Sequence, residues 1–300
     1  MPCTRWWPRV VPWFRSPGSS VDNRLSISVV VPVRNEAANL GTCLAALGRD
    51  FAEVIVVDSG STDGTARIAV EGGARLVSFE WSGGFPKKRN WVLRNVPLAA
   101  DWVLFVDADE SVTDEFKAEL RRVLPGTALA GFWLSYRNAF MDRWLRFGDR
   151  FSKLALIRKG AGEYERIDDR GWSDLDMEVH EHPVLRGAVG RIRSPIRHRD
   201  FKGMEAYARR HESYAIWEAH RYLALRQGGW AQLTARQRLK YRLLDSRLLG
   251  PAYFLACFAL KLGFLDGRAG FWFAWYKMQY FRRVKACIDG LRGTLAAAPR

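Results

Sequence analysis

The chain has 300 residues, 48% hydrophobic and 26% charged, a composition that supports a folded core and excludes a largely disordered chain. Its 47 lysines and arginines outnumber 32 aspartates and glutamates, which gives a formal net charge of +15 at pH 7. The excess lies in residues 186–300, with 23 basic and 7 acidic side chains, whereas residues 1–185 carry 24 and 25, so only the last part favours an anionic partner.

Alternating strand and helix patterns begin at Ile27. β-branched runs predict strands buried on both faces, and the segments between them show helical spacing. The predicted strands lie at 27–33, 54–57, 74–81 and 101–110, with helices at 34–49, 66–70 and from 85. Successive units of this kind imply right-handed crossovers and a mixed, mainly parallel α/β sheet with helices on both faces, which binds ligands at the carboxyl ends of its strands.

The pattern divides the chain into three parts. Residues 1–24 are expected to form a flexible basic and aromatic tail, because prolines interrupt them. Residues 25–200 are expected to form one α/β domain, whose first half is 25–125 and whose second half, richer in strand signals, is 126–200. Residues 201–300 are predicted to be a basic, amphipathic helical extension.

Two features bear on the cellular compartment. The four cysteines, Cys3, Cys43, Cys257 and Cys287, lie far apart without a CxxC pair, a pattern that indicates neither a disulfide framework nor a zinc site. The first twenty residues lack the unbroken apolar run of a signal peptide. We therefore expect a protein of the reducing cytoplasm.

The sharpest chemical signal is the pair of acids in the segment Asp107-Ala-Asp109, directly after the apolar run WVLFV. Two carboxylates one residue apart at a strand end can converge on one hard divalent cation, either Mg²⁺ or Mn²⁺. The alternative is a solvated acidic turn before the N-terminus of a helix.

Four segments together resemble a known family. PVRNE, VVDSGSTDGT, KKRN and FVDADE occur in the order and roughly the spacing of the inverting GT-A glycosyltransferases of family 2. The similarity is specific from Ile27 to about Val123. Beyond it, VHEHPVLRGAVGRIRSPIRHRDF and GFLDGRAGFWFAWY more loosely resemble a bacterial subgroup that acts on lipid-linked saccharides, including the lipopolysaccharide-core glucosyltransferases. The resemblance implies a GT-A fold, with residues 25–200 as the catalytic domain.

The resemblance also implies residues for nucleotide binding. Asp58 matches the acid that hydrogen-bonds the uracil in this family, and a short acceptor at a strand end suits an N–H on a pyrimidine edge. Ser59 stands where many relatives carry a second aspartate. The remaining implied nucleotide contacts are Val33, Asn35 and Glu36 around the base and ribose, and Lys88 and Arg89 beside the diphosphate. A plain exposed basic turn is the alternative for the last two.

An inverting transfer needs a carboxylate that takes the proton of the acceptor hydroxyl. The candidates are Asp174, Asp176, Glu178 and Glu181. Glu181 matches the position of the base in the resembled subgroup and is the predicted catalytic residue, with Asp176 second. Regular strand alternation over 176–181 would put these two on opposite faces, unless a bulge or turn intervenes.

Three histidines, His180, His182 and His198, lie close together in the second half. A third metal ligand in GT-A enzymes is often a late histidine, and by this resemblance His198 joins Asp107 and Asp109 as a predicted ligand. A hydrogen-bonded structural imidazole is the alternative.

The C-terminal part combines apolar stretches with scattered basic residues. Its best apolar window, residues 248–264, is 17 residues long and contains Pro251 and Lys261, which is at or below the short limit for a bilayer span. We expect two helices broken near LDGRAG that lie on an anionic membrane surface. The predicted headgroup contacts are the aromatic residues Phe271, Trp272, Trp275, Tyr276 and Tyr280 and the basic residues Arg282, Arg283 and Lys285. A helical pair packed on the catalytic domain is the alternative, and nucleic acid is not expected, because no recognition motif appears.

Taken together, these patterns and the resemblance predict a bacterial metal-dependent inverting glycosyltransferase. It would move a hexose from a nucleotide-diphosphate sugar, with UDP the expected nucleotide, to a lipid-linked saccharide at the cytoplasmic face of the inner membrane, in envelope polysaccharide or lipopolysaccharide synthesis. Two alternatives stay open: a polyprenyl-phosphate sugar synthase, and a non-catalytic membrane or nucleic-acid adaptor that kept the fold.

Overall fold

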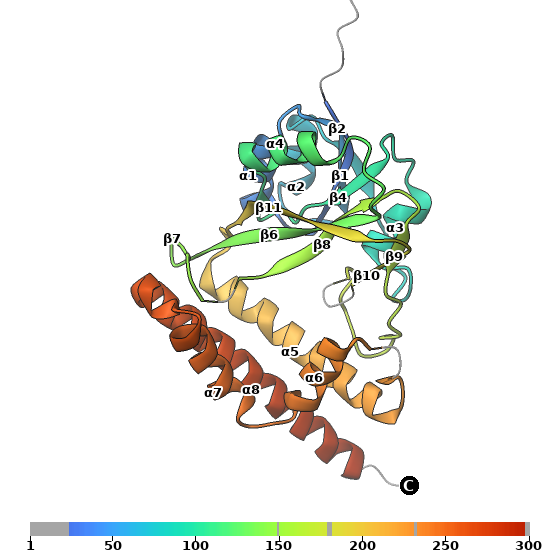
Figure 1. The fold of residues 1–300 in the computed structure, drawn as a ribbon. Coiled ribbons are helices and arrows are strands. Elements are labelled where there is room, and N and C mark those ends of the chain that lie inside the picture. Colours follow the sequence, from blue (N-terminus) through green and yellow to red (C-terminus); the bar gives the residue numbers. More distant parts are fainter. Residues whose placement is uncertain (1–23, 149, 179–181, 231–232, 298–300) are drawn as a thin grey trace, which may run out of the picture.

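The computed structural model of the chain describes residues 24–148, 150–178, 182–230 and 233–297 (Figure 1). Its centre is a nine-stranded sheet with the order β3-β2-β1-β4-β8-β6-β11-β5, and β7 pairs beside β6. Helices cover both faces, with α1 and α4 on one side and α5 on the other (Figure 1). The predicted α/β fold class is confirmed. Of the predicted tail, only Arg24 falls among the described residues.

The first half of the sheet is parallel. Strand β1 lies between β2 and β4 and runs parallel to both. Its residues from Ile27 to Val33 are buried, as its β-branched sequence predicts for a central strand. The elements of this half are β1 (Leu25–Val33), α1 (Ala37–Leu47), β2 (Phe51–Asp58), α2 (Thr65–Glu71), β3 (Arg75–Ser78), α3 (Lys88–Asn95), β4 (Trp102–Phe105), β5 (Glu110–Ser111) and α4 (Asp114–Val123).

The second half of the sheet is mixed. Strand β8 runs antiparallel to both β4 and β6, and β11 returns parallel to β6. A separate two-stranded sheet pairs β9 with β10. The elements are β6 (Gly131–Phe140), β7 (Arg143–Trp144), β8 (Ser152–Arg158), β9 (Gly162–Tyr164), β10 (Pro183–Leu185) and β11 (Val189–His198). This half brings the late strand β11 back to the acidic turn after β4, because β11 pairs with β5.

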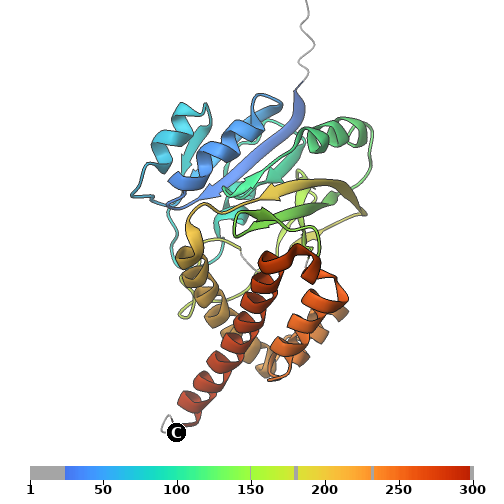
Figure 2. The ribbon, with the colours of Figure 1, turned by 90° about the vertical axis from the view of Figure 1, so that its left-hand side faces the viewer.

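The C-terminal helices form a second layer below the sheet (Figures 1 and 2). They have their own core, which includes Ala219, Leu244, Val284 and Ile288. The elements are α5 (Gly203–Gln227), α6 (Ala235–Leu244), α7 (Leu249–Leu255), a π-helical turn (Ala256–Leu260), a 3₁₀ turn (Gly263–Asp266) and α8 (Gly267–Ala297). The predicted break near LDGRAG is therefore present.

The break in these helices bears on membrane crossing. Among the described residues, no single helix is long and apolar enough to cross a bilayer. Leu249–Leu260 and Gly263–Thr294 meet the length and composition requirement only as a pair, which is bent by 73°.

The structure corrects part of the predicted headgroup boundary. The ring of Tyr276 packs 5.9 Å from that of Phe140, and Tyr280 packs 5.8 Å from His211, so both tyrosines face the protein. Phe271 and Trp272 are exposed, as predicted. The difference comes from tertiary packing, because Tyr276 lies against Phe140 of β6 and Tyr280 against His211 of α5.

Candidate active site

Three carboxylates converge where β4 ends. One ligand atom each from Asp107, Asp109 and Glu110 lies within 4.8 Å of the other two. Glu110 is buried, and its carboxylate accepts a hydrogen bond of 3.0 Å from the backbone N–H of Asp107, which closes the turn. The structure thus brings two of the three predicted metal ligands together and adds a third acid. Carboxylate oxygens in this arrangement fit a hard divalent cation.

The late strand β11 completes this cluster. Its last residue, His198, is paired in register with Glu110. The Nε2 atom of His198 lies 3.2 Å from the Oδ2 atom of Asp109. Burial lowers the pKa of the imidazole, but the adjacent Asp109 outweighs burial, and the net pKa lies above its ordinary value. The predicted histidine is therefore at the acidic cluster, where it is tied to one of the carboxylates.

Two cations flank Asp107. The Nη2 atom of Arg89 lies 2.7 Å from Oδ1, and the Nζ atom of Lys153 lies 2.5 Å from Oδ2. Lys153 also pairs with Glu110. Burial would raise the pKa of Asp107, but Lys153 and Arg89 together hold it below its ordinary range. A divalent cation bound here would share Asp107 with these basic groups.

The predicted uracil acid lies at the end of the neighbouring strand β2. Asp58 is buried, and its carboxylate accepts hydrogen bonds from the backbone N–H and the hydroxyl of Ser61, at 3.1 and 2.6 Å. The backbone N–H of Ser59 donates to the carbonyl of Val33 across the two strand ends, at 3.3 Å. The bond between Ser59 and Val33 holds the ends of β1 and β2 next to each other.

The loop after β1 is fastened to the loop after β2. Asn35 has a φ of 53° in the left-handed region, which asparagine tolerates better than most residues. Its side-chain carbonyl accepts the N–H of Thr62 at 2.8 Å, and its own N–H donates to Ser61 at 2.9 Å. The carboxylate of Glu36 pairs with Lys202 at 2.6 Å. In the structure, Asn35 and Glu36 therefore organise the predicted nucleotide loop.

Consecutive residues at the start of α3 connect the nucleotide loops to the acidic cluster. Lys88 donates from Nζ to the carbonyl of Val33 and to the hydroxyl of Ser59, at 2.9 and 2.7 Å. The next residue, Arg89, reaches Asp107. Burial lowers the pKa of Lys88, and Asp176, 3.1 Å from Nζ, opposes that effect. The exposed basic turn considered above is thus wrong for these residues, which are both buried.

The segment that holds the candidate bases is not a strand over its described part, residues 165–178. Glu178 is buried, and its carboxylate accepts the backbone N–H groups of Arg89 and Asn90, at 2.9 and 3.0 Å, so it caps the N-terminus of α3. Asp176 pairs with Lys88. The alternation argument does not apply to the described residues 176–178, because they belong to no strand. Glu181, the predicted base, lies outside the described residues, and so does His180.

Glu110 and Lys153 are the site residues that the sequence patterns did not single out. Glu110 directly follows the acidic pair, so a third acid in DADE was the available signal. Lys153 lies at the start of β8, 46 residues from Asp107, and no local pattern marks it. Only the antiparallel pairing of β8 with β4 brings it to the cluster.

Comparison with known proteins identifies the family of the chain. Residues 28–185, more than half of the chain, match the model of the family described as Glycosyl transferase family 2. The chain therefore belongs to this family and is a glycosyltransferase.

Individual relatives share parts of the chain. It is 30% identical over 179 residues to the lipopolysaccharide core biosynthesis glycosyltransferase LpsC of Rhizobium meliloti. The matched region covers 57% of this chain and 62% of that protein. It is 40% identical over 145 residues to a TPR repeat-containing protein of Synechococcus elongatus, 48% of this chain and 36% of that one. The matched regions thus span less than two thirds of either relative.

A solved structure is also similar in sequence. The structure is the glucosyl-3-phosphoglycerate synthase of Mycobacterium tuberculosis in complex with Mn²⁺, UDP and glucosyl-3-phosphoglycerate. It is 30% identical over 38% of this chain and 44% of that chain, with a TM-score of 0.31.

Proposed function

We propose that this glycosyltransferase is metal-dependent and inverting, and that it moves a hexose from a UDP-sugar to a lipid-linked saccharide at the cytoplasmic face of the inner membrane. The observation that carries the proposal is the convergence of Asp107, Asp109 and Glu110 within 4.8 Å of one another at the end of β4, in a chain of this family. The end of β4 lies beside that of β1, where the loops around Asp58 meet.

The acidic cluster fits a divalent cation by its chemistry, because all three acids offer hard oxygen ligands. Asp107 and Asp109 would hold the ion, with Glu110 and His198 as further ligands. When bound there, Mg²⁺ or Mn²⁺ would supply Lewis-acid neutralisation of the leaving diphosphate.

Charged side chains of the chain would act beside that cation. Asp58 would accept an N–H of the uracil edge, within the loop that Val33, Asn35, Glu36 and Ser59 form. Arg89 and Lys153 lie on either side of Asp107 and would face the same diphosphate charge. Lys88 would hold the two nucleotide loops together through Val33 and Ser59.

Deprotonation of the acceptor hydroxyl is assigned to Glu181. Among the other carboxylates of this segment, Glu178 caps α3 and Asp176 pairs with Lys88. A carboxylate that already accepts two backbone N–H groups is poorly placed to take a further proton in the transition state.

The acceptor class rests on the similarity to LpsC, which is named for lipopolysaccharide core biosynthesis. The exposed Phe271 and Trp272 and the basic charge of residues 186–300 support a membrane location.

The test combines nucleotide-sugar turnover with Asp109→Asn. We expect manganese-dependent hydrolysis or transfer in wild-type protein with membrane extract, and a loss on the order of 100-fold to 1,000-fold in the variant. The matched control is Asp114→Asn, because the Asp114 side chain is fully exposed on α4. Unchanged turnover in Asp109→Asn, or full activity in excess chelator, would remove the metal from the mechanism.

A second substitution distinguishes the acceptor chemistry. Glu181→Gln should be severe if a hydroxyl is deprotonated. It should be mild if the acceptor is a polyprenyl phosphate, which needs no such base.

A further inference from the structure

The C-terminal helices leave a row of apolar side chains uncovered. The exposed residues of this row are Leu248, Ala252, Leu255 and Ala259. The last three lie four, seven and eleven residues after Leu248, which is the spacing of one helix face, so the row is a stripe along α7 and the π-helical turn. Leu248 is 74% exposed and Leu255 60%. A soluble surface rarely presents such a stripe without a partner.

The turn that follows extends this apolar surface. The exposed side chains from here on are Leu260, which is the last residue of the π-helical turn, and Leu262, Phe264 and Leu265, and Leu260 is 81% exposed. Leu262 has a φ of 58°, a left-handed conformation that bulky residues rarely adopt. We call Leu248 to Leu265 the apolar edge. Its only charged residue is Lys261, and Asp266 follows directly after it.

The apolar edge is held against the catalytic domain. The N–H of Gly148 donates to the carbonyl of Lys261 at 2.9 Å. The carboxylate of Asp266 accepts the backbone N–H groups of Arg146 and Phe147, at 3.0 and 2.9 Å. The end of the apolar edge is therefore fixed to residues 146–148, which follow β7.

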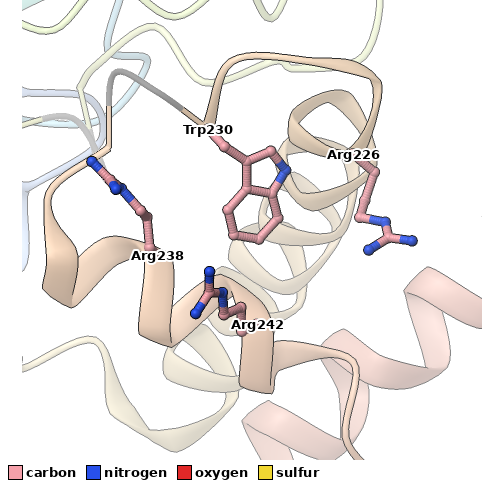
Figure 3. A pocket seen from close by; sticks show the side chains of 4 residues that line it. All are labelled: Arg226, Trp230, Arg238 and Arg242. Carbon is pink, nitrogen blue, oxygen red and sulfur yellow. The ribbon is translucent and has the colours of Figure 1, made fainter.

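A basic hollow lies between the end of α5 and α6. Figure 3 shows Arg226 from the end of α5 and Arg238 and Arg242 from α6 around the indole ring of Trp230. The hollow has a volume of about 480 Å³. Across the described parts of the chain, none of these three arginines forms an ion pair. Guanidinium groups without an acidic partner are suited to phosphate oxygens.

Helix α6 places this hollow beside further apolar residues. Arg238 and Arg242 are four residues apart, and the exposed Leu239 and Leu243 follow each of them by one position. One residue is about 100° of rotation on a helix, so a basic stripe adjoins an apolar one. This is the arrangement of a helix at the boundary between headgroups and acyl chains.

We propose that the apolar edge and the basic hollow form one docking surface for an anionic bilayer. The apolar edge enters one leaflet, and Arg226, Arg238 and Arg242 bind headgroup phosphates. This proposal rests on the membrane location given under Proposed function and identifies the surface responsible for it.

Charge decides against a second copy of the chain as the partner. Residues 186–300 carry 23 basic and 7 acidic side chains, so a symmetric dimer through this surface would set two strongly basic regions against each other. An anionic bilayer supplies both the apolar layer and the opposite charge.

The test measures flotation of the full chain with vesicles. We expect binding to phosphatidylcholine vesicles that contain about one third phosphatidylglycerol, and much weaker binding to phosphatidylcholine alone. Arg238→Gln/Arg242→Gln should weaken binding roughly 30-fold and reduce its dependence on salt. Leu255→Gln/Leu260→Gln should weaken it by at least about 100-fold and leave the salt dependence unchanged.

Matched controls carry the same arginine change and a comparable apolar-to-glutamine change on the catalytic half. Arg49→Gln/Arg122→Gln removes two exposed arginines there, and Val70→Gln/Val184→Gln replaces two valines that are 61% and 63% exposed. Both controls should bind vesicles like the wild type. All variants should keep the thermal unfolding temperature and nucleotide-sugar hydrolysis of the wild type, which separates failed docking from a failed proposed function.

Three results would overturn the proposal. The first is binding of the arginine or leucine variants equal to that of their controls. The second is a dimer in solution that the leucine variant converts to monomer, which would make the apolar edge a protein interface. The third is calorimetric binding of inorganic phosphate that requires Arg238 and Arg242 in a protein that does not bind vesicles, which would assign the hollow to a soluble phosphate compound.

Discussion

Glu178 lies at the junction between the fold and the active site, and its removal should affect both. Its carboxylate accepts the N–H groups of Arg89 and Asn90 at the first turn of α3, from 89 and 88 residues further along the chain. Arg89 in turn reaches Asp107. We therefore expect Glu178→Ala to destabilise the protein and also to misplace a cation of the active site.

The structure gives the size of the effect. Glu178→Ala leaves two buried backbone N–H groups without an acceptor, at roughly 1–3 kcal/mol each, of which water can recover a part. A total loss of about 3 kcal/mol corresponds to a decrease in melting temperature of about 6–12 °C. Displacement of Arg89 should lower turnover by about 10-fold to 100-fold. Glu178→Gln keeps one acceptor oxygen and should give a smaller loss of both.

Glu119 provides a matched control elsewhere in the fold. Its carboxylate accepts the N–H groups of Arg193 and Ser194 at 3.1 and 2.7 Å, the same type of contact, on α4. Glu119→Ala should lose similar stability and keep its turnover. Thermal unfolding followed by circular dichroism and turnover measured well below the melting temperature separate the two effects. A melting temperature of Glu178→Ala equal to that of the wild type, or equal losses of turnover in both variants, would refute the reasoning.

Two further predictions concern the acidic cluster. The pKa of His198 is higher in the folded protein than in the unfolded chain. Its pair with Asp109 therefore stabilises the fold fully below the pKa of the unfolded chain, and this stabilisation is lost as pH rises through the pKa of the folded protein. The difference in unfolding free energy between wild type and His198→Gln, on the order of 1 kcal/mol, should thus be present at about pH 5.5 and absent at about pH 9; a difference that grows with pH would contradict it. Lys153→Met should bind Mn²⁺ about 10-fold more tightly in calorimetry while turnover falls, since Lys153 occupies oxygens of Asp107 and Glu110; an unchanged affinity would show that it does not compete.

The parallel half of the fold could be predicted from local sequence. Strand β1 is a run of β-branched residues between polar segments, and such a run is buried wherever helices cover both faces of a sheet. The positions of Asp58, Asp107 and Asp109 at strand ends followed from the same pattern, because parallel strands end at one edge. The family resemblance added chemical roles to these positions.

The contacts that complete the site could not be predicted in this way. The capping of α3 by Glu178 and the pairing of Lys153 with Asp107 join segments 89 and 46 residues apart. The order of the strands and the path of the loops decide which residues Glu178 and Lys153 contact. Neither produces a periodic pattern in the sequence. For the same reason, Tyr276 and Tyr280 were expected at a membrane and instead pack inward, since helical spacing shows that a face is apolar but not what covers it.

The charges at the start of α3 explain why these contacts are required. Lys88 and Arg89 are both buried, and burial of an unpaired cation is strongly unfavourable. Each has its own carboxylate: Asp176 for Lys88 and Asp107 for Arg89. Asp107, the first of the acidic pair, is thus also the counter-ion of the buried Arg89. Asp176, in the segment before Glu181, is the counter-ion of the buried Lys88. Loss of the Asp107 or Asp176 carboxylate therefore removes both an acid of this site and the charge balance on which the adjoining helix depends, and asparagine at either position would remove that charge as well.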